Sequence, residues 1–291
     1  MTPTLPCPFP LDKILVCTDD SPASQGAVNA AFDLAQACHG RILLLYVLES
    51  FPYYEYAQPD ALGMVPRVGR EFFELRERAA REHLESRQKE AAQQGVELEV
   101  RLRTGTPAYS EILAAAADIQ PQLIIMGRRG KSGLERLLVG SVTARVIGHT
   151  SHQILVVPRN AVLSLKRLLV ATDGSPASQT ACKVALKIAK HTGGQLTAVT
   201  AGYGELDPKQ AKAIVRELAA EAKRQDVPLL TLTPGGRPEE AITQVASAKQ
   251  TDLIIMGSYG RTGLKRLFMG SVAERVIGQA ACPVLVVKGV E

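Results

Sequence analysis

The sequence predicts an α/β protein with two similar domains, each built on a parallel sheet. The chain has 291 residues, which suits two domains of about 150 residues each. Short apolar runs alternate with segments of helical periodicity, and this order occurs twice, as is typical of parallel sheets with right-handed crossovers. A glycine-containing stretch is also repeated, because 13 of 22 positions are identical between Gly127–Gly148 and Gly257–Gly278.

The first strand of each half leads into an acidic residue. Lys13–Thr18 and Arg167–Thr172 are short apolar runs that we expect to form central buried strands. Asp19 and Asp173 follow them directly, and a Ser-Pro pair soon after is a common entry to a helix. A carboxylate at the end of a strand projects into the crevice above the sheet, where it can bind a ribose or an adenine. The alternative is that both aspartates only cap their helices.

The halves differ most after their second strands. We expect a helix over Ala23–Cys38 and a strand over Arg41–Val47, which matches Gln195–Ala201 in the second half. The stretch Glu49–Arg70 is then a long loop with several tyrosines and prolines. Long loops in compact domains are usually functional or disordered, and the aromatic content favours an ordered lid or a partner surface.

A long helix is predicted after this loop, over Glu71–Gln94. It carries acidic and basic residues four positions apart, such as Glu77 and Arg81, so one of its faces should be solvated. His83 is expected on that surface and not as a ligand. The next elements of the two halves are strands over Val96–Leu102 and Val227–Leu232, then helices from Pro107 and Pro238.

A glycine motif follows the fourth strand of each half. Its spacing is G-x2-G-x9-G-S, at Gly127, Gly130, Gly140 and Ser141, and again at Gly257, Gly260, Gly270 and Ser271. Glycines let backbone N–H groups approach a phosphate closely, and a helix favours an anion at its N-terminus. Each serine would stand at the helix start as its N-cap. The motif is neither a Walker A loop nor the dinucleotide fingerprint. In the alternative interpretation, the glycines only shape a turn and cap a helix.

On these residues the chain resembles a tandem universal stress protein, over nearly its whole length. The resemblance implies two Rossmann-like domains at 11–158 and 166–288, each a five-stranded parallel sheet with helices on both faces. It also implies ATP or another adenine nucleotide as the ligand, because the ATP-binding branch of this family carries the glycine motif. Asp20 departs from the family, which usually has glycine there, as the second half has in Gly174. An extra negative charge near a phosphate site would weaken it.

The resemblance assigns nucleotide contacts to the matching positions of both halves. At the end of the second strand, the backbone at Val47 and Ala201 would contact the adenine. The complete set comprises Thr18, Asp19, Val47, Met126, Gly127, Arg128, Gly130, Gly140, Ser141, Val142, Thr172, Asp173, Ala201, Met256, Gly257, Ser258, Gly260, Gly270, Ser271 and Val272.

No catalytic constellation accompanies the glycine motif, since the sequence has no GxSxG elbow, HExxH motif or evident pair of catalytic carboxylates. We therefore expect a nucleotide-binding regulatory or stress-response protein with slow or absent ATP hydrolysis. Mg²⁺ or Mn²⁺ would be bound only through the nucleotide phosphates. A scaffold or interaction protein with purely structural glycine loops is the second interpretation. Neither the preferred adenine nucleotide nor a protein partner can be identified from the sequence.

The last strand of each half predicts how the halves associate. Ile154–Val157 and Val284–Val287 each follow a glycine-loop helix, so each should lie at one edge of its sheet. Both are apolar along their whole length, and proteins normally cover such edges. The linker, Pro158–Lys166, lacks a flexible Gly/Ser composition. We expect an internal pseudo-dimer through these strands, with a further homodimer left open.

Composition narrows the remaining classes. The net charge is +5, but basic residues are interspersed with acidic ones, so we do not expect a nucleic-acid surface. The five cysteines form no CxxC pair, and Cys17, Cys38 and Cys182 lie in apolar or helical runs. We interpret these three as buried thiols, and the odd, unpatterned set as a sign of a reducing compartment. No secretory leader or membrane-spanning stretch is visible, so a cytoplasmic protein without a membrane partner is expected.

Overall fold

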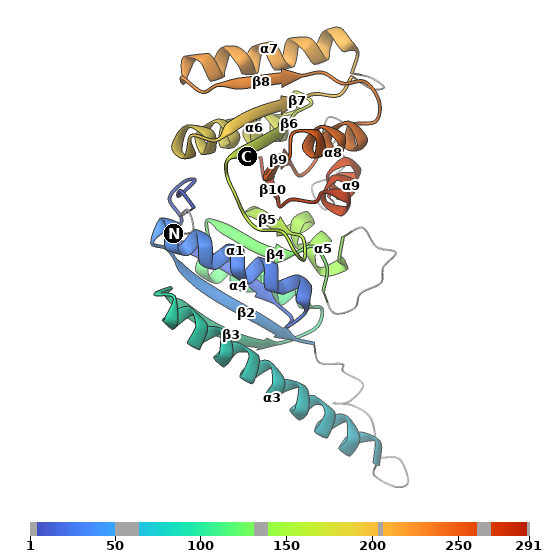
Figure 1. Cartoon of the computed structure of the whole chain (residues 1–291). Helices are drawn as coiled ribbons and strands as arrows, with labels where there is room; N and C mark the ends of the chain where they lie inside the picture. The colour runs from blue at the N-terminus through green and yellow to red at the C-terminus, as the bar shows by residue number, and fades with distance from the viewer. Residues whose placement is uncertain (1–4, 50–63, 131–138, 203–205, 261–268, 290–291) are drawn as a thin grey trace.

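A single ten-stranded sheet runs through the protein. The computed structural model describes residues 5–49, 64–130, 139–202, 206–260 and 269–289, with the backbone alone for 64–69. Within these residues the strand order is β3-β2-β1-β4-β5-β10-β9-β6-β7-β8. Figure 1 shows the two halves stacked along this sheet, with β5 and β10 between them. Each half contributes five parallel strands, as the sequence predicts.

The elements of the two halves occur in the same order. Those of the first half are β1 (Lys13–Thr18), α1 (Pro22–Cys38), β2 (Arg41–Leu48), α3 (Met64–Gln93), β3 (Leu98–Thr104), α4 (Ala108–Ile119), β4 (Leu123–Gly127), α5 (Ser141–His149) and β5 (Gln153–Val157). Those of the second half are β6 (Arg167–Ala171), α6 (Pro176–Thr192), β7 (Gln195–Val199), α7 (Pro208–Arg224), β8 (Leu229–Leu232), α8 (Pro238–Ala248), β9 (Leu253–Gly257), α9 (Ser271–Gln279) and β10 (Val284–Val287).

The last strands join the halves. β5 and β10 pair antiparallel, with Leu155 opposite Leu285, Ile154 opposite Val286, and Val156 opposite Val284. The same positions of the repeat therefore meet each other around the Leu155–Leu285 pair, as at a two-fold interface. This confirms the predicted internal pseudo-dimer. All four strand residues from Ile154 to Val157 are buried, because helices cover both faces of the sheet.

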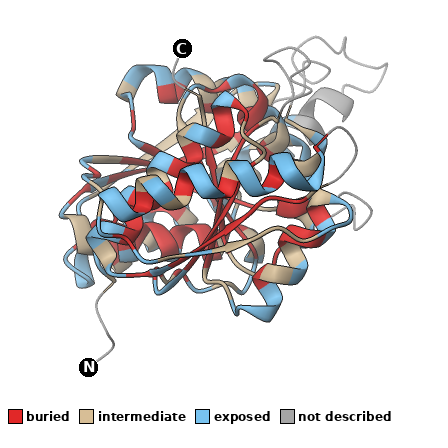
Figure 2. Ribbon diagram, turned by 90° about the horizontal axis from the view of Figure 1, so that it is seen from above, coloured by how far each residue is buried: buried red, intermediate tan, exposed pale blue. Residues whose placement is uncertain are grey.

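The helices divide between the two faces of the sheet. One apolar cluster unites α1, α3, α6 and α7 with residues such as Val16 and Val170 on one face of the strands. A second cluster unites α4, α5, α8 and α9 with the alternate strand residues, such as Leu15 and Leu169. Figure 2 shows the buried residues running along the strands and the inner sides of the helices, with exposed residues outside. Burial on both faces explains why the strands are apolar throughout.

Two predicted boundaries are corrected. The helix expected from Glu71 begins at Met64, so the predicted long loop is shorter than expected. Pro66 does not prevent this start, since the first turn of a helix leaves its N–H groups without intrahelical acceptors anyway. The rest of the predicted loop, residues 50–63, lies outside the described residues. Ser141 and Ser271 are the first helical residues and not the caps, which are Gly140 and Gly270 without a side-chain capping bond.

The cysteines also require a correction. Cys38, expected as a buried thiol, forms a disulfide with Cys7, across a sequence separation of 31. It attaches the N-terminal segment, whose Phe9 packs against the core, to the end of α1. No spacing pattern predicts this bond, because Cys7 lies in an irregular segment whose path is set by tertiary packing. Cys17, Cys182 and Cys282 are free.

Basic side chains cross between the halves beside the paired strands. Arg128 donates from Nη1 to the carbonyl oxygens of Ala280 (2.8 Å) and Ile277 (3.4 Å) at the end of α9. In the opposite direction, Lys288 donates to the carbonyl of Ile147 in α5, which is the equivalent of Ile277. Cations are favoured at helix C-termini, where carbonyls lack intrahelical donors. Burial lowers the pKa of Lys288 to about 8.

Candidate functional site

Each half has a cavity at the carboxyl ends of its strands, between its first and fourth strands. In the first half, β1 lies between β2 and β4, so the chain moves outward to one side of β1 and then returns to the other. β6 has the same position between β7 and β9. Such a change of direction leaves a crevice at the strand ends, where α/β proteins bind ligands. The two cavities measure about 210 Å³ and about 420 Å³ respectively.

A carboxylate meets a glycine in each cavity. Oδ1 of Asp19 accepts a hydrogen bond from the backbone N–H of Ser21 (3.1 Å). Its Oδ2 faces Gly130 so closely that a Cβ built there would lie 2.5 Å away. Asp173 repeats this arrangement, with Ser175 at 3.0 Å and Gly260 again at 2.5 Å. The requirement for glycine thus has a cause within the protein itself, because any side chain would displace the carboxylate.

The aspartates are not the helix caps. Ser21 and Ser175 are the N-caps of α1 and α6, and their side chains accept from the backbone N–H groups of Ser24 and Ser178. The capping alternative for Asp19 and its counterpart is therefore excluded as their direct role. Each aspartate instead fixes the turn before the helix, and its second oxygen lies at the cavity.

Most predicted site residues line the cavities, and two do not. The first cavity is lined by Thr18, Asp19, Val47, Met126, Gly127, Gly130, Gly140, Ser141 and Val142. The second is lined by Thr172, Asp173, Ala201, Met256, Gly257, Gly260, Gly270, Ser271 and Val272. Arg128 instead reaches across to α9. Its counterpart Ser258 is 1% exposed. Both follow the strand-end glycine directly, and the turn there directs their side chains away from the cavity.

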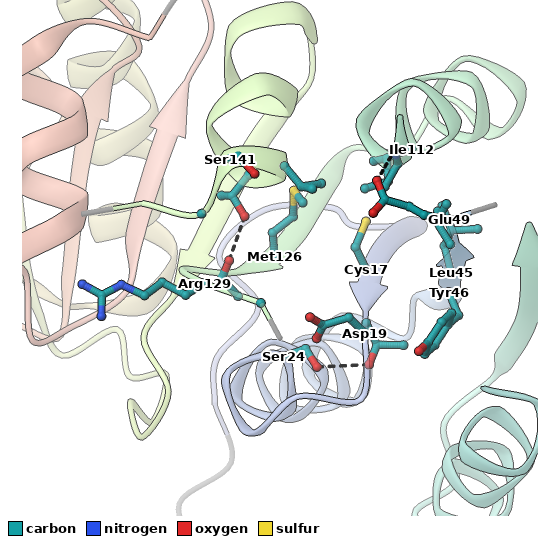
Figure 3. Close-up of a pocket in the computed structure, with 18 of the residues that line it drawn as sticks. Cys17, Asp19, Ser24, Leu45, Tyr46, Glu49, Ile112, Met126, Arg129 and Ser141 are labelled. Carbon is teal, nitrogen blue, oxygen red and sulfur yellow. Dashed lines mark hydrogen bonds between the residues drawn. The ribbon is translucent and has the colours of Figure 1, made fainter. Parts of the chain in front are cut away.

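Several lining residues were missed by the sequence reasoning. Cys17 and Leu45 pair with each other across β1 and β2 and both face the first cavity. Ile112 on α4, with its counterpart Ile242 on α8, closes the cavity from the side. Figure 3 shows Cys17, Leu45 and Ile112 among the side chains that line the first cavity, together with Asp19, Met126 and Ser141. The alternation of side chains along the strands could have identified Cys17 and Leu45, since they lie two residues before Asp19 and Val47.

The volume difference follows from the sequence. Cys17, Leu45 and Val47 in the first cavity are replaced by Ala171, Val199 and Ala201 in the second. Each replacement removes side-chain atoms from the wall of the cavity. In addition, Glu49 and Arg76 line only the first cavity among the described residues.

Polar groups at the first cavity are held by neighbours. Oε1 of Glu49 accepts from the backbone N–H of Ala108 (3.1 Å) at the start of α4. In the second half Pro238 occupies the equivalent position and has no N–H to satisfy. The hydroxyl of Thr18 lies 3.2 Å from that of Ser24. Burial raises the pKa of the Cys17 thiol to about 12, so this cavity-lining cysteine stays protonated at neutral pH.

His83 is not on the surface, and that expectation is wrong. It lies one turn after Ala80 and next to Leu84, both buried, so it belongs to the inner face of α3. Its Nδ1 is 2.7 Å from Oδ1 of Asp20, and its side chain is 10% exposed. Its Nε2 is 3.1 Å from Oγ1 of Thr18. The histidine therefore connects α3 to the end of β1, beside the cavity.

The described residues contain no group of three or more histidine, cysteine or acidic side chains that could hold a metal ion. No helix formed by them is long and apolar enough to cross a membrane.

Comparison with known proteins identifies the family. The model of the universal stress protein family matches residues 10–158 and again residues 164–288. A universal stress protein of Mycolicibacterium smegmatis is 28% identical over 294 residues, which cover 94% of this chain and 96% of that protein. One from Methanocaldococcus jannaschii is 35% identical over 146 residues, which cover 45% of this chain and 86% of that protein.

A solved structure has the same fold over both halves. The crystal structure of a universal stress protein from Archaeoglobus fulgidus is similar with a TM-score of 0.72 and 24% identity, over 97% of this chain and 100% of that chain. At this identity the similarity establishes the fold alone. The family model, by contrast, covers most of the sequence in two copies. The chain therefore belongs to the universal stress protein family and carries two of its domains in tandem.

Proposed function

We propose that both domains bind an adenine nucleotide, ATP foremost, and that the protein acts as a nucleotide-binding regulator in a stress response. The proposal rests on one arrangement that occurs twice: a strand-end carboxylate facing a glycine loop across a cavity, Asp19 with Gly130 and Asp173 with Gly260. The carboxylate suits hydroxyl or amino donors of a nucleoside. The backbone N–H groups of the glycine turn and the start of the next helix suit phosphates.

Under this proposal, Mg²⁺ or Mn²⁺ binds on the phosphates, and hydrolysis is far slower than an ordinary enzyme turnover of about 10 s⁻¹. The protein would work by changing its state with bound nucleotide and contacting a protein partner still to be identified. A steady-state hydrolysis rate near the ordinary value, surviving further purification, would contradict the binding-protein function. A cytoplasmic location remains a prediction.

The test is calorimetric titration of the full chain with ATP, ADP, AMP and cAMP, with and without Mg²⁺. Gly130→Val and Gly260→Val should each remove one binding site, because the new Cβ displaces the facing aspartate. Loss of a hydrogen bond to a charged phosphate weakens binding by about tenfold or more. Gly235→Val is the matched control, since a Cβ there meets nothing within 4 Å.

Two outcomes would contradict the proposal. If the double variant binds ATP as tightly as the native chain, the ligand is held elsewhere. If the native chain binds none of the four nucleotides and carries none after purification, the protein is better explained as an interaction protein. The close approach of Asp19 and Asp173 would then be enough to explain why Gly130 and Gly260 are glycines.

A further inference from the structure

Helix α3 gives the first cavity a cation that has no counterpart among the described lining residues of the second cavity. Arg76 lines the first cavity from α3. Aligning Val96 with Val227, the residues before the third strands, places Arg76 opposite Asp207. Asp207 is the N-cap of α7 and does not line the second cavity. The difference arises because α3 has 30 residues and α7 has 17. Helix α3 therefore extends in the N-terminal direction beyond the position at which α7 begins. Figure 1 shows α3 extending well past the sheet.

His83 holds this helix in place. It lies two turns after Arg76, and residues seven apart share one face of a helix. Its contacts with Thr18 and Asp20 connect α3 to the end of β1, and Thr18 itself lines the cavity. The position of Arg76 relative to the cavity is thus set by a polar contact only two turns away. In the second half, Ile214 occupies the position of His83.

The same histidine offsets the extra acidic residue of the first half. Asp20 would place a second negative charge beside Asp19, near the site proposed for phosphates. Its carboxylate instead faces the imidazole at 2.7 Å. Figure 3 shows that the side chain of Arg129, which also lines this cavity, extends away from the other labelled residues. Arg76, whose Cζ lies 5.9 Å from the ring centroid of Phe72, is therefore the cationic side chain that α3 contributes to the lining of the first cavity.

We infer that the two cavities select different parts of a nucleotide, with Arg76 as the specificity-determining residue of the first. The first cavity, at about 210 Å³, has less room for a nucleoside but offers a guanidinium to the phosphate chain. The second, at about 420 Å³, has apolar walls such as Leu206 and Ile242 and Asp173 as its charged lining residue among those described. The first cavity distinguishes ATP from AMP more strongly than the second does. This inference rests on the proposed function.

The experiment uses full-length single-cavity proteins, Gly260→Val for the first cavity and Gly130→Val for the second. Each is titrated with ATP, AMP and inorganic triphosphate, with and without Arg76→Met. In the first-cavity protein, Arg76→Met should weaken ATP and triphosphate by about tenfold and leave AMP within about threefold. In the second-cavity protein it should change none of them. Arg78→Met, an exposed arginine on the same helix, is the matched control. Thermal unfolding of each variant verifies that it is folded.

The possible outcomes distinguish the role of Arg76 from nucleotide binding itself. If both single-cavity proteins bind ATP but Arg76→Met behaves like Arg78→Met, the assignment of Arg76 is overturned while nucleotide binding stands. An equal ratio of AMP to ATP dissociation constants in the two cavities would overturn it as well. If neither single-cavity protein nor the native chain binds ATP, the proposed function itself fails.

Discussion

The two halves have the same fold and differ in how the helix after the second strand contacts the end of the first strand. Asp20 and Gly174 both have a positive φ, at 59° and 78°. In the second half the glycine lies under Ile214, whose Cδ1 would be 2.9 Å from an added Cβ. In the first half Asp20 extends to His83, which stands where Ile214 does. The same turn can therefore carry a glycine beneath an apolar side chain, or an aspartate that faces a histidine, and each choice fixes the residue opposite.

Of the differences between the halves, we expect the disulfide to have the largest effect on stability. The first half has Cys7–Cys38, whereas Thr192 ends the equivalent helix in the second. Cys7→Ser should lower the unfolding free energy of the first half by about 3.5 kcal/mol, given a separation of 31 residues. Denaturant unfolding followed by hydrogen exchange would assign the loss to one half. A reducing agent should have no further effect on the variant. Equal loss in both halves would contradict the assignment.

The interface cations provide a second contrast, through pH. Arg128 donates a hydrogen bond to a carbonyl at the end of α9. Its counterpart in the second half is Ser258, and the carbonyl of α5 accepts from Lys288 instead. The pKa of Lys288 falls from 10.5 to about 8 on folding. Between these values the unfolded chain binds a proton that the folded chain lacks, so stability rises with pH through this window. Below pH 8 the burial of the charged Lys288 ammonium lowers the unfolding free energy by its full amount, about 2 kcal/mol once partial exposure is allowed for.

The variant Lys288→Met tests this dependence of stability on pH. The difference in unfolding free energy between the variant and the native chain should change between about pH 8 and pH 10.5 and stay constant below pH 8. Comparing the two proteins at each pH cancels the titration of other groups. A difference that does not vary with pH would show that Lys288 stays solvated in the native protein.

Replacing His83 and Asp20 by their counterparts in the second half should have the smallest effect on stability. It is also the sharpest test of how the two halves differ. His83→Ile alone removes the imidazole that faces Asp20 and should destabilise the first half by about 1 kcal/mol. Adding Asp20→Gly reproduces the second half and should recover most of that loss. The coupling in this double-mutant cycle, measured by denaturant unfolding, should be about 1 kcal/mol. Additive effects would mean that Asp20 and His83 do not stabilise each other.

Much of the fold could be predicted because its signals are local. The strand Lys13–Thr18 has the predicted bounds, and Ile154–Val157 needs only Gln153 added to match the structure. The β5–β10 pairing followed from edge strands without polar alternation, since such edges require a cover. The start of α3 was missed because its first turn contains a proline, which usually marks a boundary. The partner of Cys7 was missed because no local pattern reports which distant residue it meets.

The cavity residues divide in the same way. Glycines and strand-end aspartates have a recognisable spacing, and the cavities contain them. Side-chain direction within a turn has no such signal, so Arg128 was included although it faces the other domain. His83 was placed outside because its helix has many charges, yet its position relative to Ala80 and Leu84 puts it inside. Nucleotide contacts at the lining residues remain predictions.

The antiparallel pairing at Leu155 and Leu285 joins two halves of one polypeptide, and this has a genetic consequence. In a homodimer encoded by one gene, every substitution at such an interface appears on both sides at once. Here each side can change alone. An arginine can be lost at Ser258 while a lysine appears at position 288, and one helix can lengthen without its twin. Covalent linkage thus frees a symmetric assembly to become unequal, one residue at a time.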